Sequence, residues 1–213
     1  SYHGTVVTED YRWLEDWNDP AVQTWSDTQN AHTRATLDRL PGVDAIRARV
    51  TEIMSAQEPS YSAVHAAGGK ILAMKLQPPR QQPILVVLES AFDLTTERVL
   101  LDPNTLDAGG LASIDWYVPS HDGHWVAVSI SKAGSESGDV AVYDVATGKS
   151  TGDVVPRVNG GTAGGSLAWA GDNSGFFYSR YPRAGERPAS DLDFYTQVYF
   201  HRLGTPTRDD VYE

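Results

Sequence analysis

The stretch Asp122-Gly123-His124-Trp125-Val126-Ala127-Val128 combines a tight turn with an apolar β-branched strand. Gly68-Gly69 and Asn173-Ser174-Gly175 open two similar phrases, and the glycines that mark the three turns (Gly69, Gly123 and Gly175) lie 54 and 52 residues apart. Four short strands in about 40–50 residues are typical of a β-propeller blade. A β-sandwich has frequent turns but no reason for this longer period. The sequence therefore predicts a mainly β chain that forms a partial propeller of about three four-stranded blades.

Short apolar runs between Gly, Asp, Asn and Pro residues extend this pattern over residues 58–213, which we assign to propeller blades. The predicted strands include Ile71–Leu76, Ile84–Leu88, Trp125–Ile130, Val140–Val145, Phe176–Ser179 and Gln197–His201. No closing strand is expected after Tyr199–Leu203. The faces of the terminal blades are expected to be open, and the side chains predicted to lie on them are Ile71, Met74, Phe176 and Tyr199.

Residues 1–57 form a separate segment with two predicted α-helices. Asp19 is a suitable N-cap with Pro20 at the first helical position, and Leu40-Pro41-Gly42 ends that helix. A second helix begins near Asp44. Each helix carries an apolar stripe that needs a packing partner. Gln29 and His32 on the first stripe either bond to that partner or face water.

The composition excludes several classes of function. The net charge is −11 and the 17 Lys and Arg residues are scattered, so neither nucleic acid nor an anionic membrane is an expected partner. The chain has no cysteine, which excludes disulfides, thiolate metal sites and a cysteine nucleophile. No apolar run is long enough to span a bilayer, and no signal peptide is visible at the N-terminus. A cytoplasmic location is expected.

No catalytic motif is recognised in the residues themselves. Gly164-Gly165-Ser166-Leu167-Ala168 and Gly134-Ser135-Glu136-Ser137-Gly138 approach the Gly-x-Ser-x-Gly nucleophile elbow, but neither completes it or precedes a helix. His121-Asp122-Gly123-His124 is interpreted as a hairpin turn with solvent-facing imidazoles rather than as a pair of metal ligands. Trp116, Trp125 and Trp169 are interpreted as packing residues. We expect no metal and no cofactor.

Six phrases, in chain order and in phase with the repeat, resemble one known family. They are Tyr2-His3-Gly4, Thr8-Glu9-Asp10-Tyr11-Arg12-Trp13-Leu14-Glu15-Asp16, Asn18-Asp19-Pro20-Ala21-Val22-Gln23-Thr24-Trp25, Val99-Leu100-Leu101-Asp102-Pro103-Asn104, Gly175-Phe176-Phe177-Tyr178-Ser179-Arg180-Tyr181-Pro182 and Val198-Tyr199-Phe200-His201-Arg202-Leu203-Gly204-Thr205. Together they are similar to the N-terminal portion of the prolyl oligopeptidase family of serine peptidases.

The resemblance implies a two-domain serine endopeptidase that cleaves short peptides after proline. In that family a seven-bladed propeller gates access to an α/β-hydrolase domain, on which the N-terminal helices pack. The Ser, Asp and His of the triad would lie beyond Glu213, so no catalytic residue is assigned here and the chain alone is expected to be inactive. This chain departs from the family pattern at two places. The family's Asp-Pro-Tyr-Arg-Trp corresponds to Glu9-Asp10-Tyr11-Arg12-Trp13 here, without the proline. The resemblance also implies an aromatic residue that lines the substrate pocket, and this chain has Asn159–Gly165 in its place.

The segment Tyr181–Asp193 resembles the mobile loop of the family at the domain interface. Its Pro, Gly and charged residues suit a loop. The predicted substrate-gating residues are Tyr181, Pro182, Arg183, Asp191 and Asp193. The alternative is a long hairpin connection with no gating role.

Two hypotheses for the function follow. The first is the N-terminal part of a prolyl oligopeptidase-like enzyme, whose partners are short proline-containing peptides and a C-terminal α/β-hydrolase domain. The second is a stand-alone β-repeat module that binds a peptide or a glycan.

Overall fold

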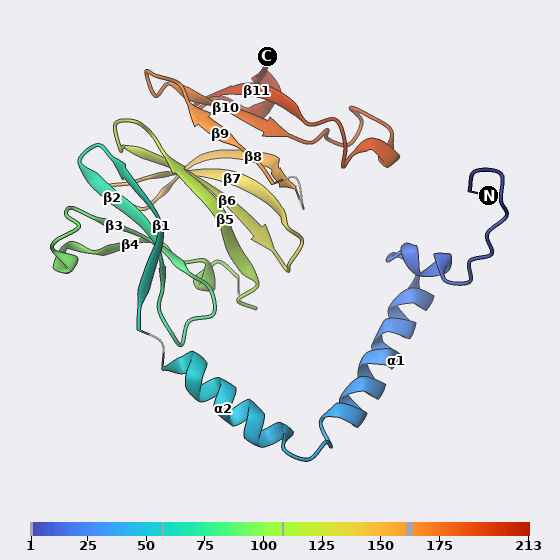
Figure 1. The fold of residues 1–213 in the computed structure, drawn as a ribbon. Helices are drawn as coiled ribbons and strands as arrows, with labels where there is room; N and C mark the ends of the chain where they lie inside the picture. The colour runs from blue at the N-terminus through green and yellow to red at the C-terminus, as the bar shows by residue number, and fades with distance from the viewer. Residues whose placement is uncertain (1, 57, 108, 161–163) are drawn as a thin grey trace. The chain divides into compact units, whose positions relative to one another are not determined.

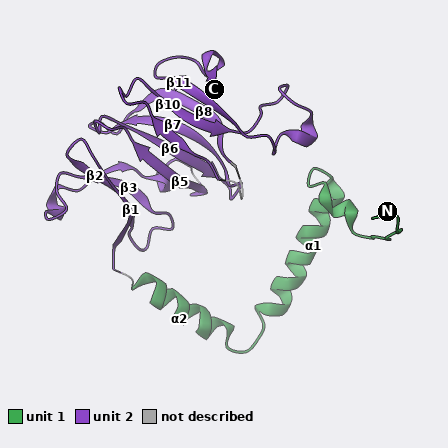
Figure 2. Ribbon diagram, turned by 45° about the horizontal axis from the view of Figure 1, so that its top comes forward, with its two compact units in different colours: residues 1–56 green, residues 57–213 purple. Residues whose placement is uncertain are grey.

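The computed structural model describes residues 2–56, 58–107, 109–160 and 164–213. The chain divides into two compact units, residues 1–56 and residues 57–213, coloured separately in Figure 2.

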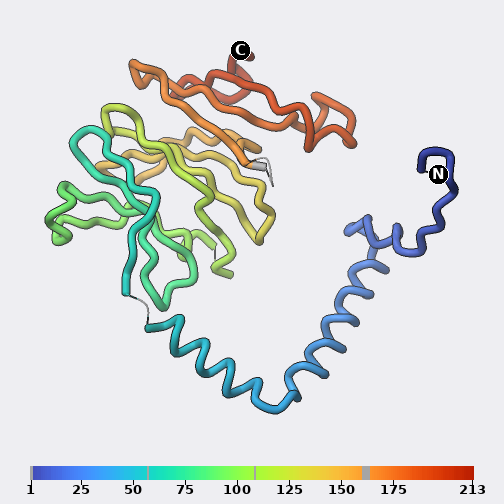
Figure 3. Tube along the Cα trace, in the orientation of Figure 1, coloured from blue at the N-terminus to red at the C-terminus, as the bar shows by residue number. Residues whose placement is uncertain are grey.

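In the second unit, the described residues form three four-stranded antiparallel sheets, which follow one another along the chain (Figures 1 and 3). The first blade comprises β1 (Ser60–Ala67), β2 (Lys70–Leu76), β3 (Ile84–Leu88) and β4 (Arg98–Leu101). The second comprises β5 (Ala112–Pro119), β6 (Trp125–Lys132), β7 (Ser137–Asp144) and β8 (Ser150–Gly160). The third comprises β9 (Leu167–Trp169), β10 (Gly175–Arg180), β11 (Gln197–Arg202) and β12 (Val211–Tyr212). The predicted mainly β fold of three blades is confirmed.

Each turn that marked the repeat connects the first two strands of its blade. Strand β12 was not predicted from the sequence; it pairs with β11 at Tyr199 and Phe200 and completes the third sheet. A two-residue strand carries no periodicity, so its pairing depends on the neighbouring strand rather than on a local pattern.

Strand β6 reads as a continuous apolar run because both of its faces are buried. Val126 and Val128 point toward the first blade, whereas Ala127 points toward the third. Two apolar cores result, one between each pair of neighbouring blades. The first contains Leu72, Leu85, Val87, Leu100, Leu101, Tyr117, Val126, Val128 and Val145. The second contains Ala127, Val140, Val142, Val155, Val158, Trp169, Phe176 and Tyr178.

The prediction that Phe176 lies on an open blade face was wrong. Its side chain is fully buried against the second blade, and Phe177, the next residue along β10, is exposed on the opposite face. Met74 also packs against the core between the first and second blades. Phe176 and Phe177 are both aromatic, so the sequence does not indicate which of them points inward. The packing of the third blade on the second decides which face of β10 is buried.

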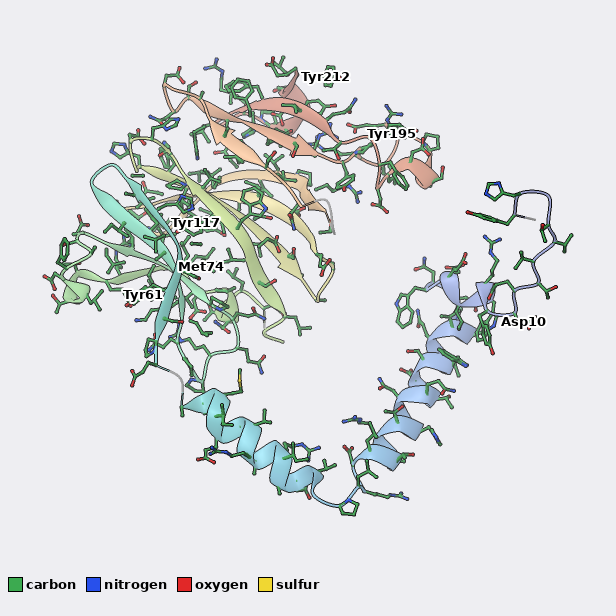
Figure 4. The ribbon with its side chains drawn as sticks, viewed as in Figure 1. Asp10, Tyr61, Met74, Tyr117, Tyr195 and Tyr212 are labelled. Atoms are coloured by element: carbon green, nitrogen blue, oxygen red, sulfur yellow. The ribbon has the colours of Figure 1, made fainter. Side chains whose placement is uncertain are left out.

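Tyr117 ties the second blade to the first (Figure 4). Its hydroxyl donates to the carbonyl of Leu72 at 2.8 Å and also contacts the carbonyl of Ala63. Ala63 has a positive φ of 46° and lies at an irregularity in β1, so the hydroxyl contacts a carbonyl displaced from the regular ladder. Burial raises the pKa of the Tyr117 phenol, which therefore remains a neutral donor.

The first turns of neighbouring blades lie against each other. A Cβ atom added to Gly68 would lie 1.9 Å from the carbonyl oxygen of Asp122, and one added to Gly123 would lie 2.6 Å from that of Ala67. Gly69, the neighbour of Gly68, also has a positive φ but has nothing within 4 Å of the added atom. A substitution at Gly69 therefore introduces backbone strain alone, whereas a substitution at Gly68 introduces the same strain and a steric collision.

We expect Gly68→Ala to destabilise the chain more than Gly69→Ala. Both substitutions place a side chain at positive φ, which costs about 1–2 kcal/mol. Gly68→Ala adds a collision with backbone that cannot swing away, worth a further ~1–3 kcal/mol. Urea unfolding of the two variants checks the difference. Equal losses would show that the two turns do not touch.

The first unit contains the two predicted α-helices, α1 (Pro20–Leu37) and α2 (Val43–Ser55), after the short 3₁₀ helix η1 (Arg12–Glu15). The Asp19 side chain caps α1 by accepting from the backbone N–H of Ala21 at 2.8 Å. Gln29 and His32 are exposed, as is most of each apolar stripe. None of the helices in the described part of the chain is long and apolar enough to cross a membrane.

Candidate functional site

The loop from Tyr181 to Thr196 joins β10 to β11, which pair along their whole length. It is therefore a long hairpin connection within the third blade, and its substrate-gating role stays a prediction. The loop contains the 3₁₀ helix η5 (Ala189–Asp191). In Figure 4 it extends from the sheet near Tyr195, whose ring packs under the Arg187 guanidinium at 4.3 Å.

The first half of the loop is fixed by a two-pronged ion pair. Arg180, at the end of β10, donates from Nη1 and Nη2 to the two carboxylate oxygens of Glu186 at 2.7 and 2.9 Å. The Arg180 side chain is only 4% exposed and Glu186 is 39% exposed. The guanidinium also lies 4.1 Å above the ring of Tyr199 on β11. Arg180 holds the pKa of the Glu186 carboxyl below its ordinary value, so the pair stays charged at neutral pH.

The second half of the loop is held from the second blade. Arg157, on β8, donates from Nη2 to the carbonyl of Leu192 at 2.7 Å and to Asp193 at 3.0 Å. The Asp193 side chain is 87% exposed, so solvent weakens this ion pair. The backbone N–H of Tyr181 in turn donates to the Arg157 carbonyl at 3.2 Å. The loop thus has one buried anchor and one exposed anchor.

The five predicted gating residues occupy different environments. Pro182 is buried, and Tyr181 and Arg183 are half-buried. Asp191 lies in η5 and accepts from the Ser190 hydroxyl, while Asp193 accepts from Arg157. The structure therefore places all five on one loop but does not converge their side chains on one point.

Arg183, in the first half of the loop, has buried nitrogen donors without a hydrogen-bond partner. Its Nη1 approaches the carbonyl of Thr207 at 3.4 Å, whereas its buried Nε and Nη2 have no hydrogen-bond partner. Among the described residues, the buried side-chain atoms without a partner all belong to Arg157, Arg180 and Arg183. These unpaired N–H donors belong to the residues that hold the loop between β10 and β11. A carbonyl or carboxylate oxygen placed there could accept hydrogen bonds from them.

Sequence reasoning missed the residues that anchor the loop. Arg157, Arg180 and Glu186 come from β8, β10 and the loop itself. Their spacing follows neither helix nor strand periodicity, so no local pattern could have paired them. The signal that the sequence did offer was the group of arginines, Arg180, Arg183 and Arg187, at the start of a long connection.

The rejected catalytic candidates have structural roles. The Ser166 hydroxyl lies 3.0 Å from that of Ser179, and strand β9 follows it rather than a helix. His121 and His124 lie in the β5–β6 turn and are exposed, as predicted. However, His121 also contacts the third blade, with Nε2 3.3 Å from the Trp169 carbonyl.

Across residues 2–56, 58–107, 109–160 and 164–213, no cluster of three or more His, Asp or Glu residues could hold a metal ion. The segment Asn159–Gly165, which the sequence predicts to depart from the family pattern, lies partly outside the described residues.

Comparison with known proteins gives one consistent family. A family model described as "Prolyl oligopeptidase, N-terminal beta-propeller domain" matches residues 1–212. A prolyl endopeptidase of Elizabethkingia meningoseptica is 30% identical over 99% of this chain and 28% of its own length. Prolyl oligopeptidase A of Amanita bisporigera is 27% identical over 96% of this chain and 29% of its own length. The chain thus spans less than a third of the curated relatives it matches.

Solved structures show the same likeness. One, from a structural and mechanistic analysis of two prolyl endopeptidases, has a TM-score of 0.87 at 31% identity and covers 99% of this chain and 30% of its own. Prolyl oligopeptidase B of Galerina marginata, bound to a 35mer hydrolysis and macrocyclization substrate, has a TM-score of 0.78 at 21% identity. It covers 97% of this chain and 30% of its own, and at this identity it shows the fold alone.

Proposed function

Because the chain belongs to the prolyl oligopeptidase family, whose N-terminal propeller model it matches over residues 1–212, we propose that it is part of a serine endopeptidase that cleaves short peptides after proline. The observation that carries this proposal is the match of the family model over residues 1–212, a range that includes all three blades. The described residues supply packing and loop anchoring, and the nucleophile and base are assigned to the remainder of the enzyme.

The blades gate access of substrate to the catalytic domain, and the loop Tyr181–Asp193 is the moving part of this gate. Its unequal anchors support this role, because the exposed Arg157–Asp193 pair can open while the buried Arg180–Glu186 pair holds. The unfilled donors of Arg183 support it further, since a peptide carbonyl would satisfy them. The analysis of two prolyl endopeptidases names inter-domain dynamics in the catalysis and specificity of those enzymes.

The helices of the first unit pack on the catalytic domain. Ile46 is 66% exposed in this chain, and Val50 and Ile53 on the same helix are also exposed. An exposed apolar stripe of this kind marks a surface that binds another protein surface. The aromatic residues Trp13 and Trp17 extend the exposed apolar surface of this unit.

Activity assays test the proposed function. The full-length natural protein is expected to hydrolyse a short prolyl-amide peptide, whereas residues 1–213 alone are expected to show no hydrolysis. Ser166→Ala in the full-length protein should change kcat/KM by less than about twofold, because the Ser166 hydroxyl bonds to Ser179 and touches no base. Hydrolysis by residues 1–213 that disappears in Ser166→Ala would overturn the assignment. A full-length protein that binds the peptide without cleaving it would also contradict it.

A further inference from the structure

The guanidinium of Arg183 has one unoccupied edge. Its Nη1 approaches the carbonyl of Thr207 at 3.4 Å, whereas Nε and Nη2 are buried and have no partner among the described residues. These two nitrogens lie on the same edge of the planar group, and their parallel N–H bonds form a fork. Buried donors without a partner are costly, so a fork with both donors unpaired points to a ligand that completes it.

Arg183 is held at both of its ends. Its backbone N–H donates to Glu186 Oε2 at 2.7 Å, within the loop. Its guanidinium reaches the carbonyl of Thr207, the first residue of the 3₁₀ helix η6 (Thr207–Asp209). The fork is therefore fixed before any ligand arrives, and a donor pair that is already fixed loses little conformational entropy when it binds.

The carboxylates of the loop do not fill this fork, because each of the three accepts from another side chain. The donors are Arg180 to Glu186, Ser190 to Asp191 and Arg157 to Asp193. The loop and its anchors thus carry more positive than negative charge, in a chain whose net charge is −11. A local excess of positive charge with unpaired donors favours an anionic ligand.

The geometry of the fork selects the kind of anion. A peptide carbonyl offers one oxygen, whereas a carboxylate offers two in one plane, at the spacing of the two N–H bonds. A carboxylate also balances the charge of the guanidinium. Within a peptide, this group occurs at the C-terminus and on the side chains of Asp and Glu.

We propose that the fork of Arg183 binds a carboxylate of the peptide substrate, so that the enzyme favours acidic peptides over neutral ones. The inference rests on the proposed function, because it takes the ligand to be the peptide that is cleaved. The fork is buried and has to be uncovered before a ligand reaches it. The exposed Arg157–Asp193 ion pair is the weaker of the two anchors of the loop, and its opening gives the ligand access.

Three acetylated peptides of one sequence with a single internal proline test the proposal in the full-length natural protein. The first has Asn at its N-terminal end and a C-terminal amide, the second has a free C-terminal carboxylate instead of the amide, and the third has Asp in place of Asn. In the unmodified protein, kcat/KM should be about tenfold higher for an acidic peptide than for the neutral one, through a lower KM. The peptide that gains shows which carboxylate binds.

Three variants separate the fork from its charge. In Arg183→Gln the ratio of kcat/KM between acidic and neutral peptides should fall to about one. Arg183→Lys keeps the positive charge but not the fork, and should lose most of the ratio. Arg187→Gln is the matched control, because it removes one positive charge from an exposed position on the same loop and should retain the ratio.

Cleavage with equal kcat/KM for all three peptides in the unmodified protein would overturn the inference and leave the proposed function standing. A ratio retained in Arg183→Gln, or lost equally in Arg187→Gln, would overturn it too. Absence of any cleavage would contradict the proposed function instead. The Kd values of fluorescently labelled peptides, measured by anisotropy, then decide the inference by the same ratio, and the unmodified protein suffices where a variant does not fold.

Discussion

Replacing Glu186 with alanine is expected to destabilise the third blade by about 3–5 kcal/mol, because it leaves the Arg180 guanidinium buried without a counter-ion. Arg180 is 4% exposed and cannot turn toward water without leaving its position above the Tyr199 ring. The reverse change, Arg180→Met, should cost less. It removes the buried charge, keeps the aliphatic volume, and leaves Glu186, which is 39% exposed and can hydrate.

The expected difference between Glu186→Ala and Arg180→Met can be tested with a double variant. The double variant Arg180→Met with Glu186→Ala should recover most of the stability that Glu186→Ala loses, because no charge is then left buried. Asp193→Ala, which breaks the exposed anchor, is the control and should cost less than about 1 kcal/mol. Local unfolding free energies from hydrogen exchange in β10 and β11 measure all four proteins. Equal losses in Glu186→Ala and Arg180→Met, with no recovery in the double variant, would contradict a buried pair.

The Arg180–Glu186 ion pair also makes the stability of the third blade depend on pH. The pKa of Glu186 is held below its ordinary value of 4.5 by Arg180, so the carboxylate favours the folded state above that value. The contribution is lost as pH falls through the lowered pKa. Acidification therefore weakens the ion pair that fixes the first half of the loop, and local unfolding of β10 and β11 followed by hydrogen exchange at falling pH measures this loss.

The blades could be predicted from the sequence because their signals are local. The turns at Gly69, Gly123 and Gly175 are fixed by neighbouring residues, and the strands that follow them begin where the apolar runs begin. The helix start at Asp19 is local for the same reason, since its side chain caps a backbone N–H two residues away.

The anchors of the loop and the blade interfaces could not be predicted. Glu186 meets Arg180 only because the loop folds back on the end of β10, and His201 meets Asp153 only once the blades are stacked. The choice between Phe176 and Phe177 also depends on stacking, because both are aromatic and alternation alone does not say which face is covered. Sequence periodicity reports on one element at a time, whereas these contacts join different elements.

Residues 1–213 alone are expected to self-associate through the open face of the third blade. Phe177 and Val198 are exposed there on β10 and β11, and Val211 on β12 is exposed beside them. Phe177 packs against Phe200 at 5.0 Å between ring centroids, so the face is a continuous apolar surface rather than a set of isolated residues. Sedimentation velocity over about a hundredfold range of concentration should show the weight-average mass rising with concentration.

Lysine substitutions locate this contact. Burying one such side chain is worth ~1.5–3 kcal/mol, so Phe177→Lys or Val198→Lys should weaken self-association by roughly tenfold to a hundredfold. Val154→Lys is the control, because Val154 is at least as exposed as Phe177 and Val198 but lies on the second blade. A separately produced C-terminal remainder of the natural protein should suppress self-association of the unmodified chain, since it would cover the same face. A monomer whose mass ignores both concentration and that remainder would contradict an open blade and favour a self-contained binding module. Equal weakening by all three lysines would instead place the contact elsewhere, because only two of them lie on the face that the third blade leaves uncovered.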